Sequence, residues 1–339
     1  MASSEPLTPE EQKARRRRML LYGLAVVLLI PTLAIVIVNR IPTEVPPPLW
    51  TPDELPAPAE ADNGWTLIAH YHSTTISGID LDPIDKLLHA VRKDEKVPNL
   101  TRLWSPARVV ASKITEHTKL CTEAFSRKRL VIPCLSLEPD ACTTEPVEIC
   151  TRLVTFAALD QAWGGSPAGA ALLATVLERL TDVASNSPHP WMQARTLVRL
   201  RDAVHHAGAL IKWHRGNASA VRAALEALGP DALPVEHIVI ANYLLKHMAI
   251  REALAHTDTW LLDEGSIMRG LNAPFEVAKQ GGALPPPAVH TEGAFWWFEN
   301  PIGKKMLDAM KPGADEDYGK TLELRESVLK RRGEALALK

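Results

Sequence analysis

The sequence predicts an all-α protein, an irregular helical bundle carried outside the membrane on a single N-terminal transmembrane helix. Residues 19–38 form an uncharged apolar stretch, and apolar residues recur with helical spacing from residue 82 onward. Alternation typical of strands is nearly absent. The expected divisions are a cytosolic basic tail at 1–18, the transmembrane helix at 19–38, a proline-rich stalk at 39–63 and an extracytoplasmic helical domain at 64–339.

The apolar stretch is long enough to span a bilayer. Thirteen of the twenty residues 19–38 are Leu, Ile or Val, and a helix of that length covers about 30 Å, the thickness of the hydrocarbon core. A secretory signal has a shorter apolar region followed by a small-residue cleavage site. Here Arg40 and a run of prolines follow instead. The pattern favours an uncut signal-anchor over a cleaved peptide.

Basic residues around this helix predict its orientation. Lys13 and the run Arg15 to Arg18 precede it, whereas Arg40 stands alone after it until Lys86. Because basic flanks stay in the cytosol, residues beyond the helix should lie outside, and a bacterial inner membrane with a periplasmic domain fits best. The whole chain carries 38 basic and 40 acidic residues. This near balance does not suggest a nucleic-acid partner.

The segment after the membrane helix is rich in proline and acidic residues. Seven prolines and five acidic side chains fall within residues 41–63. Such composition favours extended polyproline II at about 3.1 Å per residue. We therefore expect a stalk that holds the helical domain up to about 70 Å from the bilayer.

All four cysteines lie within thirty residues of one another, at Cys121, Cys134, Cys142 and Cys150. An even, clustered set outside the cytosol is typical of disulfides. Three pairings are possible, and we favour the nested one, Cys121–Cys150 around Cys134–Cys142. The alternative of a metal site or redox pair has weaker support, because there is no C-x-x-C and the spacings match no zinc knuckle.

Start and stop signals place the remaining helices, with proline near the start and glycine past the end of several. The expected helices cover 82–93, 106–125, 146–163, 167–185, 191–215, 218–228, 234–254, 301–310 and 322–338. Residues 64–79 form the one strand-like run, and residues 129–137 are compatible with a short strand. The glycine- and proline-rich residues 263–290 are expected to be a long surface connection.

The chain lacks the usual motifs of catalysis and cofactor binding, including G-x-S-x-G, H-E-x-x-H, G-x-G-x-x-G and the P-loop. We therefore predict no cofactor and no metal. Asp202 and His206 lie four residues apart on a helix and are interpreted as a surface ion pair. His70 and His72 would share one face of a strand, which is a weak metal signal on its own.

The most unusual local composition is an aromatic run beside two lysines. Four consecutive aromatic residues cannot all face one core, so some must contact another element, a partner or lipid headgroups. The simplest interpretation is that they fill the seam between the last helix and the body. The functional interpretation is a partner-binding patch. Its members would be Phe295, Trp296, Trp297, Phe298, Lys304 and Lys305.

Together these patterns favour a membrane-anchored scaffold or protein-interaction module of the cell envelope, with a protein as its partner. The alternative is an anchored envelope hydrolase that uses Glu or His residues the sequence does not pair. Glu236 and Glu252, on a mostly apolar helix, are candidates for it if they are buried.

Overall fold

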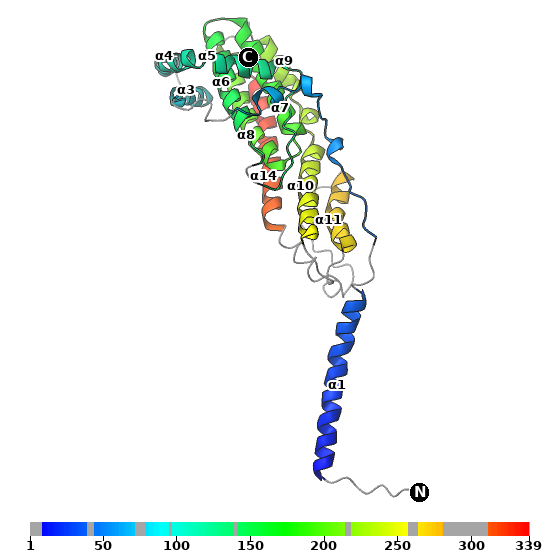
Figure 1. Cartoon of the computed structure of the whole chain (residues 1–339). Helices are drawn as coiled ribbons and strands as arrows, with labels where there is room; N and C mark the ends of the chain where they lie inside the picture. Colours follow the sequence, from blue (N-terminus) through cyan, green and yellow to red (C-terminus); the bar gives the residue numbers. More distant parts are fainter. Residues whose placement is uncertain are drawn as a thin grey trace, which may run out of the picture.

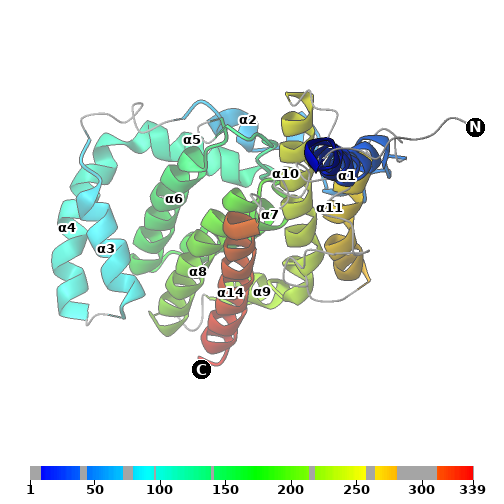
Figure 2. The ribbon, with the colours of Figure 1, turned by 90° about the horizontal axis from the view of Figure 1, so that it is seen from below.

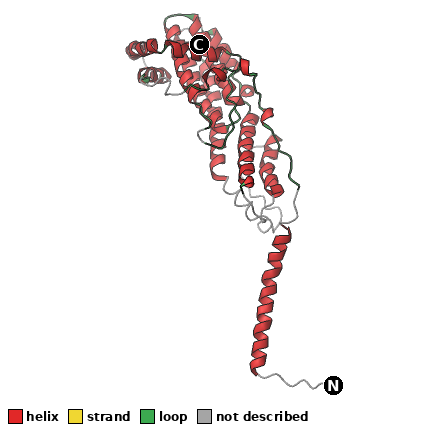
Figure 3. Cartoon of the chain, viewed as in Figure 1, coloured by secondary structure: helices red, strands yellow, loops and turns green. Residues whose placement is uncertain are grey.

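The computed structural model describes residues 9–38, 44–71, 79–94, 97–138, 141–213, 218–256, 264–280 and 311–338. Within these ranges the chain is all α, with twelve α-helices and no strand, which confirms the predicted fold class. Figures 1 and 3 show a long separate rod, α1, below an elongated helical body.

Helix α1, Pro9–Val38, contains the apolar stretch. Its residues Gln12–Ala34 have a mean hydropathy of 1.6 and bury nothing against the body. Among the described residues, no other helix is long and apolar enough to cross a membrane. The helix begins ten residues before the apolar stretch, so part of the basic tail is helical. Arginine, lysine and glutamine favour helix, and proline suits its first position.

The centre of the body is a stack of long helices. Helix α7, Pro167–Asn186, packs between α6, Glu145–Trp163, and α8, Pro190–Trp213, and α14, Lys311–Leu336, lies along α8. Figure 2 shows α3, Asp82–Arg92, and α4, Val97–Lys113, together at one side. The remaining α-helices are α2, Trp65–Ile68, α5, Thr115–Ser126, α9, Ser219–Ala227, α10, Val235–Ala255, and α11, Glu264–Lys279.

Most predicted helices are confirmed, and four expectations need correction. Pro106 lies inside α4, and the expected helix 106–125 is interrupted at Ile114, whose φ of −118° is not helical. Residues 65–68 are helical, and the run at 129–137 forms only one isolated bridge, from Arg129 to Asn63. Residues 264–279 form α11, which packs on α10 and carries Pro274 in its interior. Packing of their apolar faces outweighs proline's local preference in α4 and α11.

Arginines on α14 hold it against the shorter α9. Arg332 donates from Nε to the Leu225 carbonyl at 2.6 Å and from Nη2 to the Glu226 carbonyl at 3.0 Å. Arg325, only 7% exposed, donates to the Leu233 carbonyl at 2.5 Å. The last carbonyls of a helix have no partner within it, so these guanidinium groups satisfy the C-terminus of α9 and the turn beyond.

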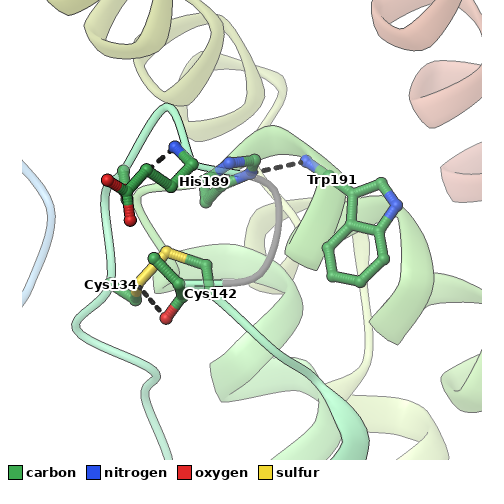
Figure 4. Close-up of a disulfide and its surroundings, with 7 residues drawn as sticks. Cys134, Cys142, His189 and Trp191 are labelled. Carbon is green, nitrogen blue, oxygen red and sulfur yellow. Dashed lines mark hydrogen bonds between the residues drawn. A yellow bond between two sulfur atoms is a disulfide. The ribbon is translucent and has the colours of Figure 1, made fainter.

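The cysteines pair in the nested arrangement that their spacing favours. Cys121 on α5 joins Cys150 on α6 within the main core, and Cys134 joins Cys142 across a loop. Figure 4 shows the second disulfide beside His189. Burial lowers the pKa of His189, and a hydrogen bond with the Ser136 backbone partly opposes this shift. Its Nδ1 accepts a hydrogen bond from the Trp191 amide at 3.2 Å. The bridged loop is therefore held against the start of α8.

Residues 44–63, which we call the docking segment, lie along the body and are not the free stalk expected from their composition. Trp50 is 3% exposed, with its ring 5.4 Å from that of Tyr243 on α10 and 6.4 Å from that of Phe275 on α11. At the other end Asn63 donates to the Val131 carbonyl at 2.8 Å and accepts from the Val131 amide at 3.0 Å.

The prolines make this docking easier because they carry no N–H that burial would leave without a partner. Several of its other backbone groups bond side chains of the body. The Leu49 amide donates to Tyr243 Oη at 2.9 Å, and Tyr243 donates to Asn272 Oδ1 at 3.0 Å. Asn272 in turn donates to the Pro47 carbonyl at 3.3 Å. The docking segment is thus bound to α10 and α11 by both apolar and polar contacts.

Close helix packing at Gly169 gives a test of the core. A Cβ at this position would lie 2.3 Å from the Ala158 carbonyl oxygen on α6. We expect Gly169→Ala to lower the free energy of unfolding by about 1–3 kcal/mol, because α6 and α7 must separate. Gly319→Ala on α14, where nothing lies within 4 Å of the added atom, is the control and should be neutral or slightly stabilising. Equal effects of the two substitutions on urea denaturation would contradict this packing.

Candidate functional site

A cleft of about 710 Å³, lined by charged and apolar side chains, lies between α3, α6 and α8, with Leu103 of α4 at its edge. The amphipathic α3 explains its mixed lining. Helix α3 buries Ile84, Leu87 and Val91 in the core and leaves its charged face toward the cleft. The charged and histidine side chains that line the cleft are Asp82, Asp85, Lys86, His89, Arg92, Arg152, Arg199, Asp202 and His206.

Three arginine–carboxylate ion pairs join the helices around this cleft. One links α3 to α8, one links α3 to α6, and one links α6 to α8. They are Arg92–Asp202 at 2.8 Å, Arg152–Asp85 at 3.1 Å, and Arg199–Glu148. Burial alone would raise the pKa of Glu148, but hydrogen bonds from Thr144 and Arg199 outweigh it and lower the pKa. The Glu148 carboxylate is therefore held ionised, and the three pairs join α3, α6 and α8.

The sequence suggested that His206 forms a surface ion pair with Asp202, and the structure shows that it does not. It is 5% exposed, and its Nε2 lies 3.0 Å from the Leu88 carbonyl oxygen. A carbonyl only accepts, so Nε2 carries the proton and Nδ1 is a free lone pair. Burial lowers the pKa of His206 to about 4, which leaves the ring neutral near pH 7. Asp202 pairs with Arg92 on α3 instead.

Four polar atoms beneath the cleft have no hydrogen-bond partner among the described residues. They belong to what we call the cleft floor, and they are Thr151 Oγ1, Thr155 Oγ1, Arg152 Nε and His206 Nδ1. A buried polar atom without a partner costs about 1–3 kcal/mol. Four such atoms in residues that line one cleft are therefore a costly arrangement that a polar ligand would relieve.

The residues singled out from sequence for metal or acid–base chemistry do not assemble. In the described part of the chain no three His, Cys, Asp or Glu side chains are placed to hold a metal ion. His70 lies after α2 and not on a strand, and His72 is outside the described residues. Glu236 and Glu252 are exposed on α10.

The predicted partner-binding patch, Phe295 to Phe298 with Lys304 and Lys305, lies outside the described residues. No family model, curated protein or solved structure matches this chain. Its function must therefore follow from the geometry and charges of its own residues. Sequence reasoning missed the cleft, although Thr151 and Thr155 gave a signal as two hydroxyl residues four apart on one face of a helix.

The buried neutral His206 predicts acid sensitivity. In the unfolded chain a histidine binds a proton at about pH 6.5, whereas His206 in the folded protein does so only at about 4. The unfolded state therefore binds more protons between these values, so stability present above about pH 6.5 is lost as the pH falls toward 4. The loss from this group is roughly 3 kcal/mol.

Substitution of His206 by glutamine keeps a donor for the Leu88 carbonyl but removes the titration. We expect His206→Gln to reduce the fall in unfolding free energy between pH 7 and pH 4. Urea denaturation of the full chain in detergent, followed by tryptophan fluorescence, measures it. Thr155→Val, which removes no titrating group, should keep the wild-type pH dependence. If the unfolding free energy of His206→Gln falls with pH as steeply as that of the wild type, the ring is not buried and neutral.

Proposed function

We propose that this chain is a single-pass inner-membrane protein whose periplasmic helical domain acts as a scaffold or protein-interaction module of the cell envelope. The apolar α1 supports anchoring, and the basic residues before it favour a cytosolic N-terminus. The two disulfides support an oxidising compartment for the body.

The docking segment is the observation that carries the proposal. A flexible tether would leave the proline-rich segment free of the body, whereas the buried Trp50 and the Leu49–Tyr243 hydrogen bond hold the docking segment against it. Full burial of a large apolar side chain contributes about 1.5–3 kcal/mol. A body held in this way suits a module that presents one surface to a partner in a defined orientation.

The alternative of an envelope hydrolase has less support. Each acidic residue that lines the cleft pairs with a basic one, Asp82 with Lys86, Asp85 with Arg152, and Asp202 with Arg92. Burial raises the pKa of Asp182. Its carboxylate forms ion pairs with Arg129 and Arg179 and accepts a hydrogen bond from the Leu130 amide. Its contacts hold the 129–131 segment on α7, and they leave no open position for a substrate.

Thiol labelling tests the orientation. Glu10 on α1 and Val277 on α11 are both exposed. In spheroplasts, an impermeant maleimide should label Val277→Cys and should label Glu10→Cys only after the membrane is lysed. Labelling at Glu10 without labelling at Val277 before lysis would reverse the proposed topology.

Photocrosslinking tests the partner. A photoreactive residue in place of Trp296 or Trp297 should trap one protein adduct of fixed mass in intact cells, because aromatic anchors dominate such contacts. The same residue at Val277, which is 44% exposed on α11, is the matched control and should not give that adduct. Absence of an adduct at both tryptophan positions, with the protein folded and inserted, would contradict the patch.

A further inference from the structure

The cleft floor combines groups that could receive one kind of ligand. Thr151, Arg152 and Thr155 lie within one turn of α6, so residues three and four apart share a face. His206 stands opposite on α8. Arg152 offers Nε–H while its Nη1 is bound to Asp85, and His206 offers a lone pair on Nδ1. The floor therefore presents hydrogen-bond donors on one side and an acceptor on the other.

The charges of the cleft limit what can enter. Each acidic residue of the lining already neutralises a basic one, and Arg199 is neutralised by Glu148. The cleft has no excess positive charge for a doubly charged phosphate. Its spare capacity is in hydrogen-bond donors, which suit a single carboxylate, because guanidinium groups bind carboxylates through paired N–H bonds.

We propose that the cleft floor binds a small hydroxylated carboxylate, a hydroxy acid or sugar acid. Its carboxylate accepts hydrogen bonds from Arg152 Nε and the Thr151 and Thr155 hydroxyls. A hydroxyl of the ligand donates to His206 Nδ1. This arrangement gives a partner to each of the four buried polar atoms and explains why polar side chains occupy positions that the core could have filled with apolar ones.

Access requires the Asp85–Arg152 pair to open. The side chains of Arg152 and Asp85 are 32% and 44% exposed, and ion pairs this close to solvent are weak. The ligand carboxylate replaces Asp85 on the guanidinium, and Asp85 turns to water, so Arg152 keeps one carboxylate partner. Asp85 is therefore a competitor for Arg152, and its removal should favour the ligand.

Calorimetric titration of the full chain in nanodiscs tests the ligand class. D-Glucuronate and D-lactate should each bind saturably at millimolar or lower concentration. D-Glucose lacks the carboxylate and acetate lacks the hydroxyl, so each should bind at least about tenfold more weakly. Absence of saturable binding by both acids, or equal binding of D-glucose, would overturn the proposal.

Variants test the site. Arg152→Gln should weaken D-glucuronate binding by about tenfold or more, Thr155→Val should weaken it by a smaller factor, and Asp85→Asn should tighten it. Arg108→Gln is the matched control, because Arg108 also pairs with an aspartate, Asp160, but does not line the cleft. Wild-type affinity in Arg152→Gln, or an equal loss in Arg108→Gln, would overturn the site. If Arg152→Gln fails to fold, unchanged affinity in Thr155→Val overturns it.

Discussion

The burial of Trp50 between α10 and α11 is the contact on which the arrangement of this protein depends. It joins the docking segment, which follows α1 in the sequence, to the helical body. Tyr243 adds specificity, since its hydroxyl accepts from the Leu49 amide and donates to Asn272. Without these contacts the proline-rich residues would be a spacer. With them, the docking segment becomes part of the folded body.

The body in turn separates two kinds of stabilisation. Its main core is apolar and closely packed, tied by the disulfide between Cys121 and Cys150. The cleft between α3, α6 and α8 is instead bordered by ion pairs, with Arg152 and Arg92 both engaged by carboxylates. Such pairs fix geometry more than they add stability. A rim of ion pairs above unpartnered polar atoms is an arrangement suited to binding a polar ligand.

Much of the fold was predictable because local signals determined it. Proline at Pro83 and Pro146 marked helix starts, and the even cysteine set favoured the nested pairing that the structure has. Signals that depend on tertiary contacts failed. Helix α11 carries a proline, which locally disfavours a helix. Its apolar face is stabilised by packing against α10 and Trp50, which the local sequence does not show.

The site was less predictable for a similar reason. The cleft collects residues from three helices that are far apart in sequence, and no motif spans them. The pairing of Asp202 with Arg92, which are 110 residues apart, displaced the local pairing with His206. Sequence spacing shows that His206 lies four residues from Asp202. It does not show that folding brings Arg92 to 2.8 Å from Asp202.

Hydrogen exchange at the Leu49 amide in the full chain, inserted in nanodiscs, tests the account most directly. This amide is bound to Tyr243 across 194 residues of sequence. A docked segment predicts protection well above that of an unstructured peptide, and loss of that protection in Trp50→Ala. Exchange at the rate of an unstructured chain in the wild-type protein would show a free stalk and contradict the docked segment.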